Sequence, residues 1–311
     1  MKITSALESA FESGTVVTIG TFDGVHIGHK KIIERLVAKA KEEQLQSVVI
    51  TFFPHPRMVL HQDSQIKLLN TIEEKSQRLE ALGLDHLVIK KFTPEFSRST
   101  ALEFVEDLLV NKLKTKHLII GYDHRFGRNR AANIDDLREF GKNFDFEVIE
   151  ISAQEINEVA VSSTKIRHAL QEGNVKMANR YLGHPYMLSG RVVHGQGLGK
   201  ELKFPTANLQ IAENYKLIPK PGVYVVRSQI DGKRVYGMMN IGTKPTVNVD
   251  GDQYIEIHLF DFNRDIYGED LRIEVLNWIR SEQKFESVEA LKLQLKKDRK
   301  MARSYIKKHH D

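Results

Sequence analysis

The stretch TVVTIGTFDGVHIGHKKIIERL, from Thr15 to Leu36, joins a strand-like run to a helix-like run through a turn that holds glycines, an aspartate and two histidines. The β-branched residues that open it are typical of a buried strand. The apolar residues that follow recur at the spacing of one helix face, and these are Ile32, Ile33, Leu36, Val37 and Ala40. A strand that leads directly into a helix is the repeating unit of a parallel sheet.

This alternation continues to about Gly183. The strand-like runs VVTIG, SVVITFF, HLVIKKF, HLIIGY and FEVIEI alternate with the helical patterns KKIIERLVAKAKEE, TALEFVEDLLVNKL and IDDLREFGKNF. We therefore predict an α/β domain over residues 1–183, in which helices cover both faces of a parallel sheet. Nucleotides commonly bind such sheets at the carboxyl ends of their strands.

A different pattern begins at residue 184. Strand candidates follow one another closely, with Gly, Pro and Asn turns between them: GRVVHG, FPTANLQI, GVYVVRSQIDGKRVYGMMNIG, QYIEIHLFDF and DLRIEVLNWI. We predict a small antiparallel β-barrel or sandwich over residues 184–311, joined to the first domain near residues 183–187. Within it, Asp231 and Gly232 predict a tight hairpin turn. The terminal helical pattern carries an apolar stripe that we expect to pack on the barrel: Val288, Leu291 and Leu295.

Composition limits the class of protein. A chain of 311 residues has room for two domains, and 41% hydrophobic with 28% charged residues is typical of a globular protein. No run approaches the ~20 apolar residues needed to cross a bilayer. The N-terminus carries Glu8 and Glu12 and has no apolar core of a secretory signal. The absence of cysteine excludes disulfides and thiolate metal sites, so we expect a cytoplasmic protein.

The net charge of +5 raises the question of nucleic-acid binding. The segment from Ser287 to Asp311 holds eight Lys or Arg against three Asp or Glu, which equals the excess of the whole chain. One basic terminal segment is more often a solvated helix face than a nucleic-acid groove. We therefore expect neither a nucleic-acid nor a membrane partner.

The two histidines of the opening stretch admit three interpretations. His26 and His29 could bind a metal ion, although no third ligand is evident, or they could be ordinary core or surface residues. The third interpretation is phosphate chemistry. A helix N-terminus attracts anions through its free N–H groups and its dipole, and the turn permits close backbone approach at Gly20, Gly24 and Gly28.

The segment GTFDGVHIGH, within residues 20–29, favours the third interpretation. Its last four residues resemble the signature of the nucleotidyltransferase superfamily, and all ten resemble the form found in bacterial bifunctional riboflavin kinase/FAD synthetases. The resemblance implies that His26 and His29 stabilise charge that develops on the α-phosphate of ATP. It also implies nucleotide contacts in the same turn at Gly20, Phe22, Asp23, Gly24 and Gly28.

Two further segments resemble the same family. SSTKIR, Ser162 to Arg167, resembles its second nucleotide-binding motif, in which Ser163 and Thr164 would bind phosphate and Arg167 would neutralise pyrophosphate. Without the resemblance, this segment is an ordinary helix cap. IIGYDHRFGRNR, Ile119 to Arg130, resembles the flavin and adenosine contact loop, with Asp123 as a nucleotide contact.

The second half carries a motif of its own. GRVVHGQGLGKELKFPTANL, Gly190 to Leu209, resembles the riboflavin kinase motif in which a glycine-rich loop precedes a Pro-Thr-Ala-Asn strand. Its spacing fits neither a P-loop nor a Rossmann fingerprint. Side chains two apart on a strand share a face, so Thr206 and Asn208 could both reach one Mg²⁺ carried by ATP. The resemblance adds nucleotide contacts at Gly195, Gly199, Lys200 and Pro205.

Alternation in YIEIHLF places Glu256 and His258 on the face opposite Ile255, Ile257 and Leu259. Such a glutamate is usually just solvated. The equivalent glutamate of the kinase family is the base that takes the proton of riboflavin's terminal ribityl hydroxyl, which implies this role for Glu256.

The resemblance spans nearly the whole chain and implies two reactions. Riboflavin and ATP would give FMN in the C-terminal barrel, and FMN and ATP would give FAD and pyrophosphate in a Rossmann-like N-terminal nucleotidyltransferase domain. The expected ligands are therefore riboflavin, FMN, FAD and ATP, with Mg²⁺. Two residues depart from the family pattern, Phe53 and His124. The alternatives are another nucleotidyltransferase of the superfamily and a basic nucleic-acid-binding regulator.

Overall fold

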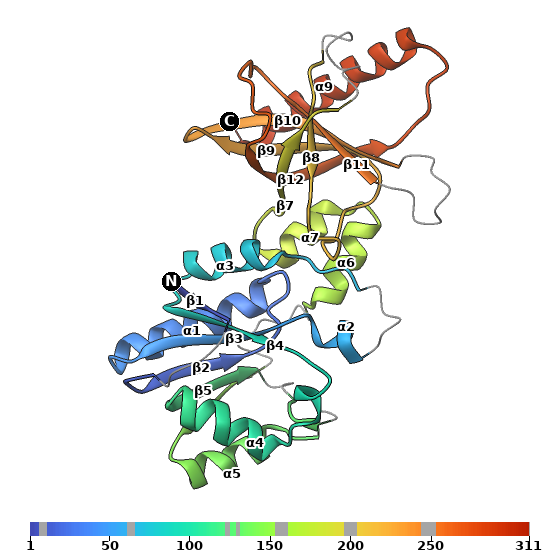
Figure 1. Ribbon diagram of the computed structural model, residues 1–311. Coiled ribbons are helices and arrows are strands. Elements are labelled where there is room, and N and C mark those ends of the chain that lie inside the picture. The colour runs from blue at the N-terminus through green and yellow to red at the C-terminus, as the bar shows by residue number, and fades with distance from the viewer. Residues whose placement is uncertain are drawn as a thin grey trace. The chain divides into compact units, whose positions relative to one another are not determined.

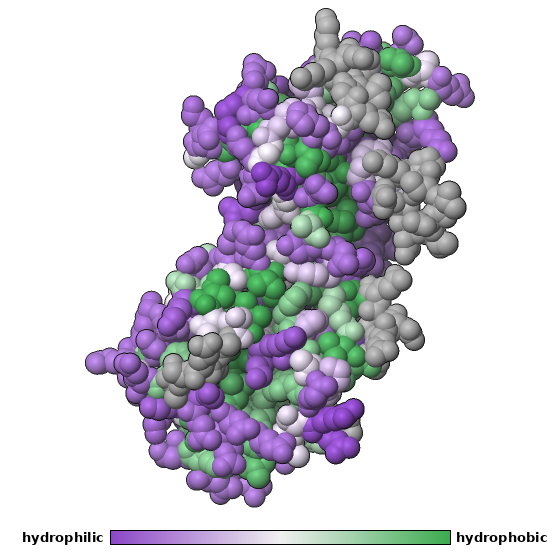
Figure 2. All heavy atoms as spheres, in the orientation of Figure 1, coloured by the Kyte–Doolittle hydropathy of each residue, from purple (hydrophilic) through white to green (hydrophobic). Residues whose placement is uncertain are grey.

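The computed structural model describes residues 1–5, 11–60, 66–121, 125–128, 131–152, 161–195, 204–243 and 253–310. The chain forms two compact units, Met1–Ser162 and Ser163–Asp311 (Figure 1). On the face shown in Figure 2, hydrophilic residues cover most of the outside of each unit. Among the described residues, no helix is long and apolar enough to cross a membrane.

The first unit is built on a six-stranded sheet in which every neighbouring pair is parallel, as predicted. The strand order is β1-β4-β3-β2-β5-β6. After β2, the chain adds β3 and then β4 on one side of this strand, and it then crosses back to place β5 on the other side of β2. This reversal creates a switch point at the carboxyl end of β2, where ligands bind in open α/β sheets. The strands are β1 (Lys2–Thr4), β2 (Thr15–Ile19), β3 (Gln46–Phe53), β4 (His86–Lys91), β5 (Thr115–Gly121) and β6 (Glu147–Ile151).

Helices cover both faces of this sheet (Figure 1). On one face, α1 (Ile27–Glu42) and α3 (Ile72–Ala81) pack on alternate strand residues such as Val16 and Val49. The predicted face of α1 is confirmed, because Ile33, Leu36, Val37 and Ala40 are buried and Ile32 packs beside them. The remaining helical segments of this unit include α2 (Pro56–Leu60) and η1 (Phe96–Arg98).

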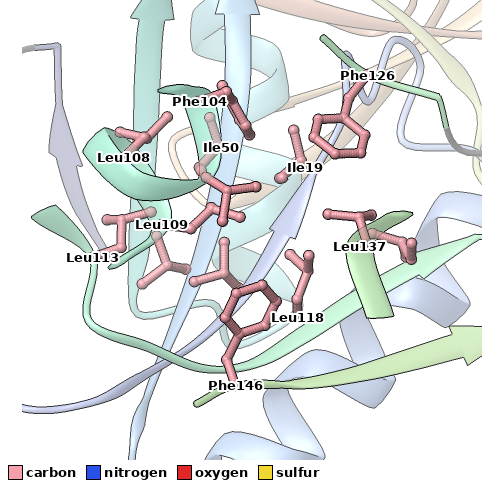
Figure 3. Packing of buried hydrophobic residues seen from close by; sticks show 14 of the residues in the cluster. Ile19, Ile50, Phe104, Leu108, Leu109, Leu113, Leu118, Phe126, Leu137 and Phe146 are labelled. Atoms are coloured by element: carbon pink, nitrogen blue, oxygen red, sulfur yellow. The ribbon is translucent and has the colours of Figure 1, made fainter. Parts of the chain in front are cut away.

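The other face is covered by α4 (Ala101–Phe104), the π-helical segment η2 (Val105–Lys112) and α5 (Ile134–Phe144). Figure 3 shows how their side chains meet the strands: Ile19, Ile50 and Leu118 of the sheet lie against Phe104, Leu109 and Leu137. Residues on adjacent positions of β2 therefore serve different cores, since Val16 faces one layer and Val17 the other.

The second unit contains a closed barrel with the strand order β10-β11-β8-β7-β12-β9, and all its pairs are antiparallel. The predicted antiparallel barrel is thus confirmed. The predicted hairpin turn is also present, because Asp231 and Gly232 connect β9 to β10 with φ of 52° and 73°. The strands are β7 (Tyr186–Val193), β8 (Ala207–Gln210), β9 (Gly222–Ile230), β10 (Lys233–Thr243), β11 (Gln253–Leu259) and β12 (Asp270–Ser281).

The terminal helix α9 (Val288–His310) packs on the barrel through Leu295, Ala302 and Ile306. The predicted stripe is wrong at Val288, which is 50% exposed. Val288 is the first residue of α9, and the barrel covers this face of the helix farther along, at Ala302 and Ile306. On the same face, the buried carboxylate of Asp298 accepts hydrogen bonds from Arg280 of β12, from Nε at 3.0 Å and from Nη2 at 2.8 Å. This charged pair anchors the middle of α9.

Helices α6 (Ser163–Gln171) and α7 (Val175–Leu182) belong to the barrel unit. The Asn179 side chain joins α7 to two strands: its Nδ2 donates to the Val275 carbonyl at 2.8 Å, and its Oδ1 accepts from the Tyr186 N–H at 2.7 Å. The Lys220 N–H likewise donates to the Leu170 carbonyl at the end of α6. The structure therefore groups these helices with the barrel, while the division at residue 183 stays a prediction.

Candidate active sites

The loop that follows β2 contains residues with left-handed backbone. Phe22, Gly24 and Val25 have φ of 46°, 86° and 41°. Gly20 has no room for a side chain without adjustment, because a Cβ there would lie 3.0 Å from the Phe22 ring. The ring of Phe22 also makes an edge contact with the His29 ring at 5.1 Å. Tight packing of Phe22 thus connects the glycine turn to the first turn of α1.

His26 is the N-cap of α1. The backbone N–H of His29 donates to its Nδ1 at 3.3 Å, so a neutral His26 carries its proton on Nε2. The two imidazole rings stack with centroids 3.6 Å apart and planes 14° apart. Gly28 lies buried in the first turn between them. The structure therefore brings together seven predicted residues at one strand-to-helix junction: Gly20, Phe22, Asp23, Gly24, His26, Gly28 and His29.

Both histidines are uncharged near neutral pH. Burial lowers the pKa of His26 to about 4, although the Asp23 carboxylate opposes the shift. Burial also lowers the pKa of His29 well below its usual value, and the nearby His26 and Lys75 act in the same direction. The Nδ1 atom of His29 is buried and has no hydrogen-bond partner within the described residues. An uncharged imidazole still offers an N–H to an anion at this helix N-terminus.

Asp23 anchors this loop to a distant part of the chain. Its buried carboxylate accepts hydrogen bonds from the N–H groups of Leu69 and Asn70 at 2.9 and 3.3 Å. These residues lie directly before Thr71, the N-cap of α3, which forms a capping box with Glu74. Asp23 therefore fixes the position of the loop relative to α3.

Lys75 is a charged residue of this site that the sequence analysis missed. It is buried on α3, and its ammonium donates to the Thr21 carbonyl at 2.7 Å and to the Thr51 hydroxyl at 3.2 Å. Burial lowers the pKa of Lys75 to about 8, against the attraction of Asp23. The helical pattern could have indicated that Lys75 is buried, because Lys75 lies four residues before the buried Leu79 and thus on the same face of the helix.

The remaining predicted residues of the adenylyltransferase motifs belong to other elements of the chain. Ser163, Thr164 and Arg167 occupy the first two turns of α6, within the unit that contains the barrel. Phe53 ends β3. Asp123 and His124 fall outside the described residues.

Predicted kinase residues meet on neighbouring barrel strands. Glu256 of β11 lies opposite Asn208 of β8 on one side and Asn240 of β10 on the other. Asn208 also closely approaches the backbone of Gly195, where a Cβ would lie 2.0 Å from the Asn208 amide nitrogen. A glycine is therefore needed at this position unless Asn208 moves.

The strand that carries Asn208 is shorter than predicted. Pairing of β8 begins at Ala207, so Thr206 lies just before the strand, and the preceding Pro205 has no N–H to donate to a ladder. The Pro205 carbonyl instead accepts a hydrogen bond from Nδ1 of His258 at 2.8 Å. His258 is buried beside the rings of Phe204 and Phe260, so it supports the start of β8 from within the fold. Gly199 and Lys200 fall outside the described residues.

The sequence did not predict two residues that interact near Glu256, which are Tyr254 and Glu282. Tyr254 donates its hydroxyl hydrogen to Glu282 Oε1 at 3.2 Å, and the N–H of Thr243 donates to Oε2 at 3.4 Å. Burial raises the pKa of Tyr254, and the charges of Glu282 and Glu256 add to the shift. Thr243 ends β10, Tyr254 lies in β11 and Glu282 directly follows β12, so only the folded barrel brings them together.

No group of three or more His, Cys, Asp or Glu side chains that could hold a metal ion occurs in the part of the chain that the structure describes. Mg²⁺ does not require such a group, because it usually takes one or two protein oxygens together with substrate phosphates and water. Asn208 and Glu256, which are register neighbours, offer oxygen donors of the kind that Mg²⁺ prefers.

Comparisons with known proteins cover both units. A family model described as FAD synthetase matches residues 8–165, and one described as riboflavin kinase matches residues 182–306. A curated Listeria monocytogenes protein, named bifunctional riboflavin kinase/FMN adenylyltransferase, is 38% identical over 95% of this chain and 94% of its own length. The Escherichia coli protein of the same name is 36% identical over 96% and 95%.

Solved structures include a match to nearly the whole chain. This Streptococcus pneumoniae chain, described as a macrolide-efflux protein, is 33% identical with a TM-score of 0.87. The match covers 97% of this chain and 98% of that one.

Proposed function

The chain belongs to the bifunctional riboflavin kinase/FMN adenylyltransferase family, and from this premise we propose which of its residues carry the two reactions. The protein phosphorylates riboflavin to FMN and adenylylates FMN to FAD with release of pyrophosphate, using ATP as co-substrate in both steps. The two family matches leave no role for the alternatives considered from sequence. A different nucleotidyltransferase would lack the kinase half, and a nucleic-acid-binding regulator would need neither half.

In the adenylyl transfer, His26 and His29 donate hydrogen bonds to the α-phosphate as the FMN phosphate attacks it and pyrophosphate leaves. The observation that carries this assignment is the stacked pair of uncharged imidazoles at the N-terminus of α1, with the buried Nδ1 of His29 lacking a partner in the described structure. Gly20, Gly24 and Gly28 admit the nucleotide close to the backbone. Phe22 and Asp23 hold the loop in place.

Ser163, Thr164 and Arg167 complete the proposed nucleotide contacts, together with Asp123. Hydroxyls and N–H groups in the first turn of α6 suit a phosphate, and a guanidinium neutralises the charge of departing pyrophosphate.

In the kinase reaction, Glu256 accepts the proton of the terminal ribityl hydroxyl as that oxygen attacks the γ-phosphorus and ADP leaves. The pairing of Glu256 with Asn208 across β11 and β8 supports this assignment. Thr206 and Asn208 would hold Mg²⁺, which when bound neutralises charge on the ATP phosphates. Gly195, Gly199, Lys200 and Pro205 would line the nucleotide. We also place the protein in the cytoplasm, in keeping with a chain that has no cysteine.

One chromatographic assay tests both assignments. The full-length protein is incubated with ATP, MgCl₂ and either riboflavin or FMN, and riboflavin, FMN and FAD are resolved over time. A change in the His26–His29 pair should slow only the step from FMN to FAD, and a change at Glu256 only the step from riboflavin to FMN. Equal slowing of both steps by either change would contradict the division of roles.

A further inference from the structure

The barrel unit has a cavity whose lining includes none of the proposed kinase residues. It lies among the β9–β10 turn, the connection from β11 to β12 and the C-terminal part of α9, and its volume is about 730 Å³. Its lining residues on β10 run from Lys233 to Tyr236, and Tyr236 precedes Asn240, the register partner of Glu256, by four residues, or roughly 13 Å of strand at ~3.3 Å per residue. Pockets of a few hundred to about 1,000 Å³ take small organic ligands. We call this the distal cavity.

The charges that line the distal cavity do not cancel. Both of its acidic residues already have partners, because Asp231 pairs with Arg264 at 3.1 Å and Asp261 with Arg303 at 2.8 Å. The other cationic lining residues are Lys233, Arg234 and Lys307. None of these three makes an ion pair or side-chain hydrogen bond with another residue that the structure describes. The cavity therefore presents an excess of positive charge.

The same cavity has aromatic walls. Tyr236 and Phe262 line it together with Phe260, and the Arg303 guanidinium lies over the Phe260 ring at 5.0 Å. Phe260 and Ile306 are buried and form part of the core beneath. The rings that remain partly exposed, those of Tyr236 and Phe262, favour a planar ring, while unpaired Lys and Arg side chains favour phosphate oxygens.

We propose that the distal cavity binds a planar aromatic ring that carries a phosphate ester, the chemistry shared by FMN and nucleoside monophosphates. Inorganic phosphate lacks the ring and riboflavin lacks the phosphate, so neither satisfies both features of the cavity. The site is separate from the proposed catalytic residues, and its failure would leave the two reactions as assigned.

Hydrogen–deuterium exchange of the full-length protein locates binding directly. We expect FMN or AMP to slow exchange in peptides that cover residues 230–236 and 260–264, whereas riboflavin or inorganic phosphate at the same concentration leaves exchange there unchanged. Protection by FMN alone would identify a flavin site, and protection by AMP alone a nucleotide site. No protection by either compound, or equal protection by riboflavin or by inorganic phosphate, would overturn the proposal.

Two neighbouring lysines of α9 provide a matched pair of variants. Lys307 lines the distal cavity, while Lys308 is exposed and does not. Lys307→Glu should raise the FMN or AMP concentration for half-maximal protection about tenfold, because a charge-assisted contact is lost and a repulsion added. Lys308→Glu makes the same charge change and should leave this concentration unaltered.

Thermal melting identifies any variant that fails to fold, and Arg234→Gln then replaces Lys307→Glu. If Lys307→Glu or Arg234→Gln folds and the ligand still slows exchange in the same peptides at the same concentration, ligand bound at a catalytic site causes the slowing, and the proposal is overturned.

Discussion

The imidazole rings of His26 and His29 stack face to face, with centroids 3.6 Å apart. Two imidazolium cations at this distance would repel each other, and burial lowers the pKa of His26 to about 4. The pair is therefore uncharged at neutral pH, and it can meet a phosphate only through its N–H groups and through the N-terminus of α1.

Replacing His29 by Ala tests the role of this pair. We expect FAD formation from FMN to fall roughly 10²–10³-fold, the usual effect of losing one preorganised donor. Riboflavin phosphorylation should continue unchanged, because Glu256 lies in the other unit. The matched control is His117→Ala in β5 of the same sheet. Undiminished FAD synthesis in the His29 variant would refute the assignment.

Acidification should destabilise the fold through His26. Its folded-state pKa is about 4 against an ordinary value of 6.5, so the unfolded chain binds more protons between these pH values. This contribution to stability is complete above pH 6.5 and is lost as the pH falls toward 4. When the pH is lowered from 7.5 to 5, the free energy of unfolding should therefore fall by about 2 kcal/mol less in His26→Gln than in the unaltered protein. Urea unfolding at both pH values measures the difference, and identical losses would contradict it.

Replacing Lys75 by Met should damage the adenylyltransferase site without touching the kinase site. The Thr21 carbonyl would lose the ammonium that holds it, which typically costs about 1–3 kcal/mol for a buried group. We expect a lower melting temperature and a lower kcat for FAD formation, with FMN formation unchanged. Lys41→Met, on the exposed face of α1, is the control. If the Lys75 variant kept normal FAD synthesis, Lys75 would not position the loop.

Glu256→Gln keeps the shape of the side chain and removes its basicity. FMN formation from riboflavin should fall about 10²–10⁴-fold, the range for loss of a general base, while FAD formation from supplied FMN continues. Glu286→Gln, at an exposed position, serves as the control. Unchanged kinase turnover at neutral pH would exclude Glu256 as the base.

Two fragments test where the kinase unit begins. A fragment over residues 161–311 keeps Asn179, which joins α7 to Tyr186 and to Val275. A fragment over residues 185–311 loses these bonds, the bond from the Lys220 N–H to the Leu170 carbonyl and the buried residues of α6 and α7. We expect both to make FMN and neither to make FAD, with the shorter one less stable by several kcal/mol.

Urea unfolding of the two fragments measures that difference. Equal stability would place the boundary near residue 183, as the sequence pattern predicts. If both fragments melted cooperatively and made no FMN with ATP and Mg²⁺, the kinase site would need residues of the first unit.

Patterns among residues close together in sequence were sufficient to predict much of the fold. Alternation of β-branched runs with helical spacing predicted the parallel sheet, and Asp231-Gly232 predicted the hairpin, because both depend on residues close in sequence. The turn from Gly20 to His29 was predictable in the same way, since its strand, its glycine turn and its helix cap are contiguous in the sequence.

Tertiary packing decided the rest, because the contacts concerned join residues far apart in sequence. The carboxylate of Asp23 binds Leu69, the ammonium of Lys75 binds the Thr21 carbonyl, and Glu256 meets Asn208 only through strand register. The exposure of Val288 was not predictable either, because helix periodicity identifies the apolar face of α9 but not which part of that face the barrel covers. Amino-acid spacing identifies which face of an element is apolar; only the folded arrangement determines what that face meets.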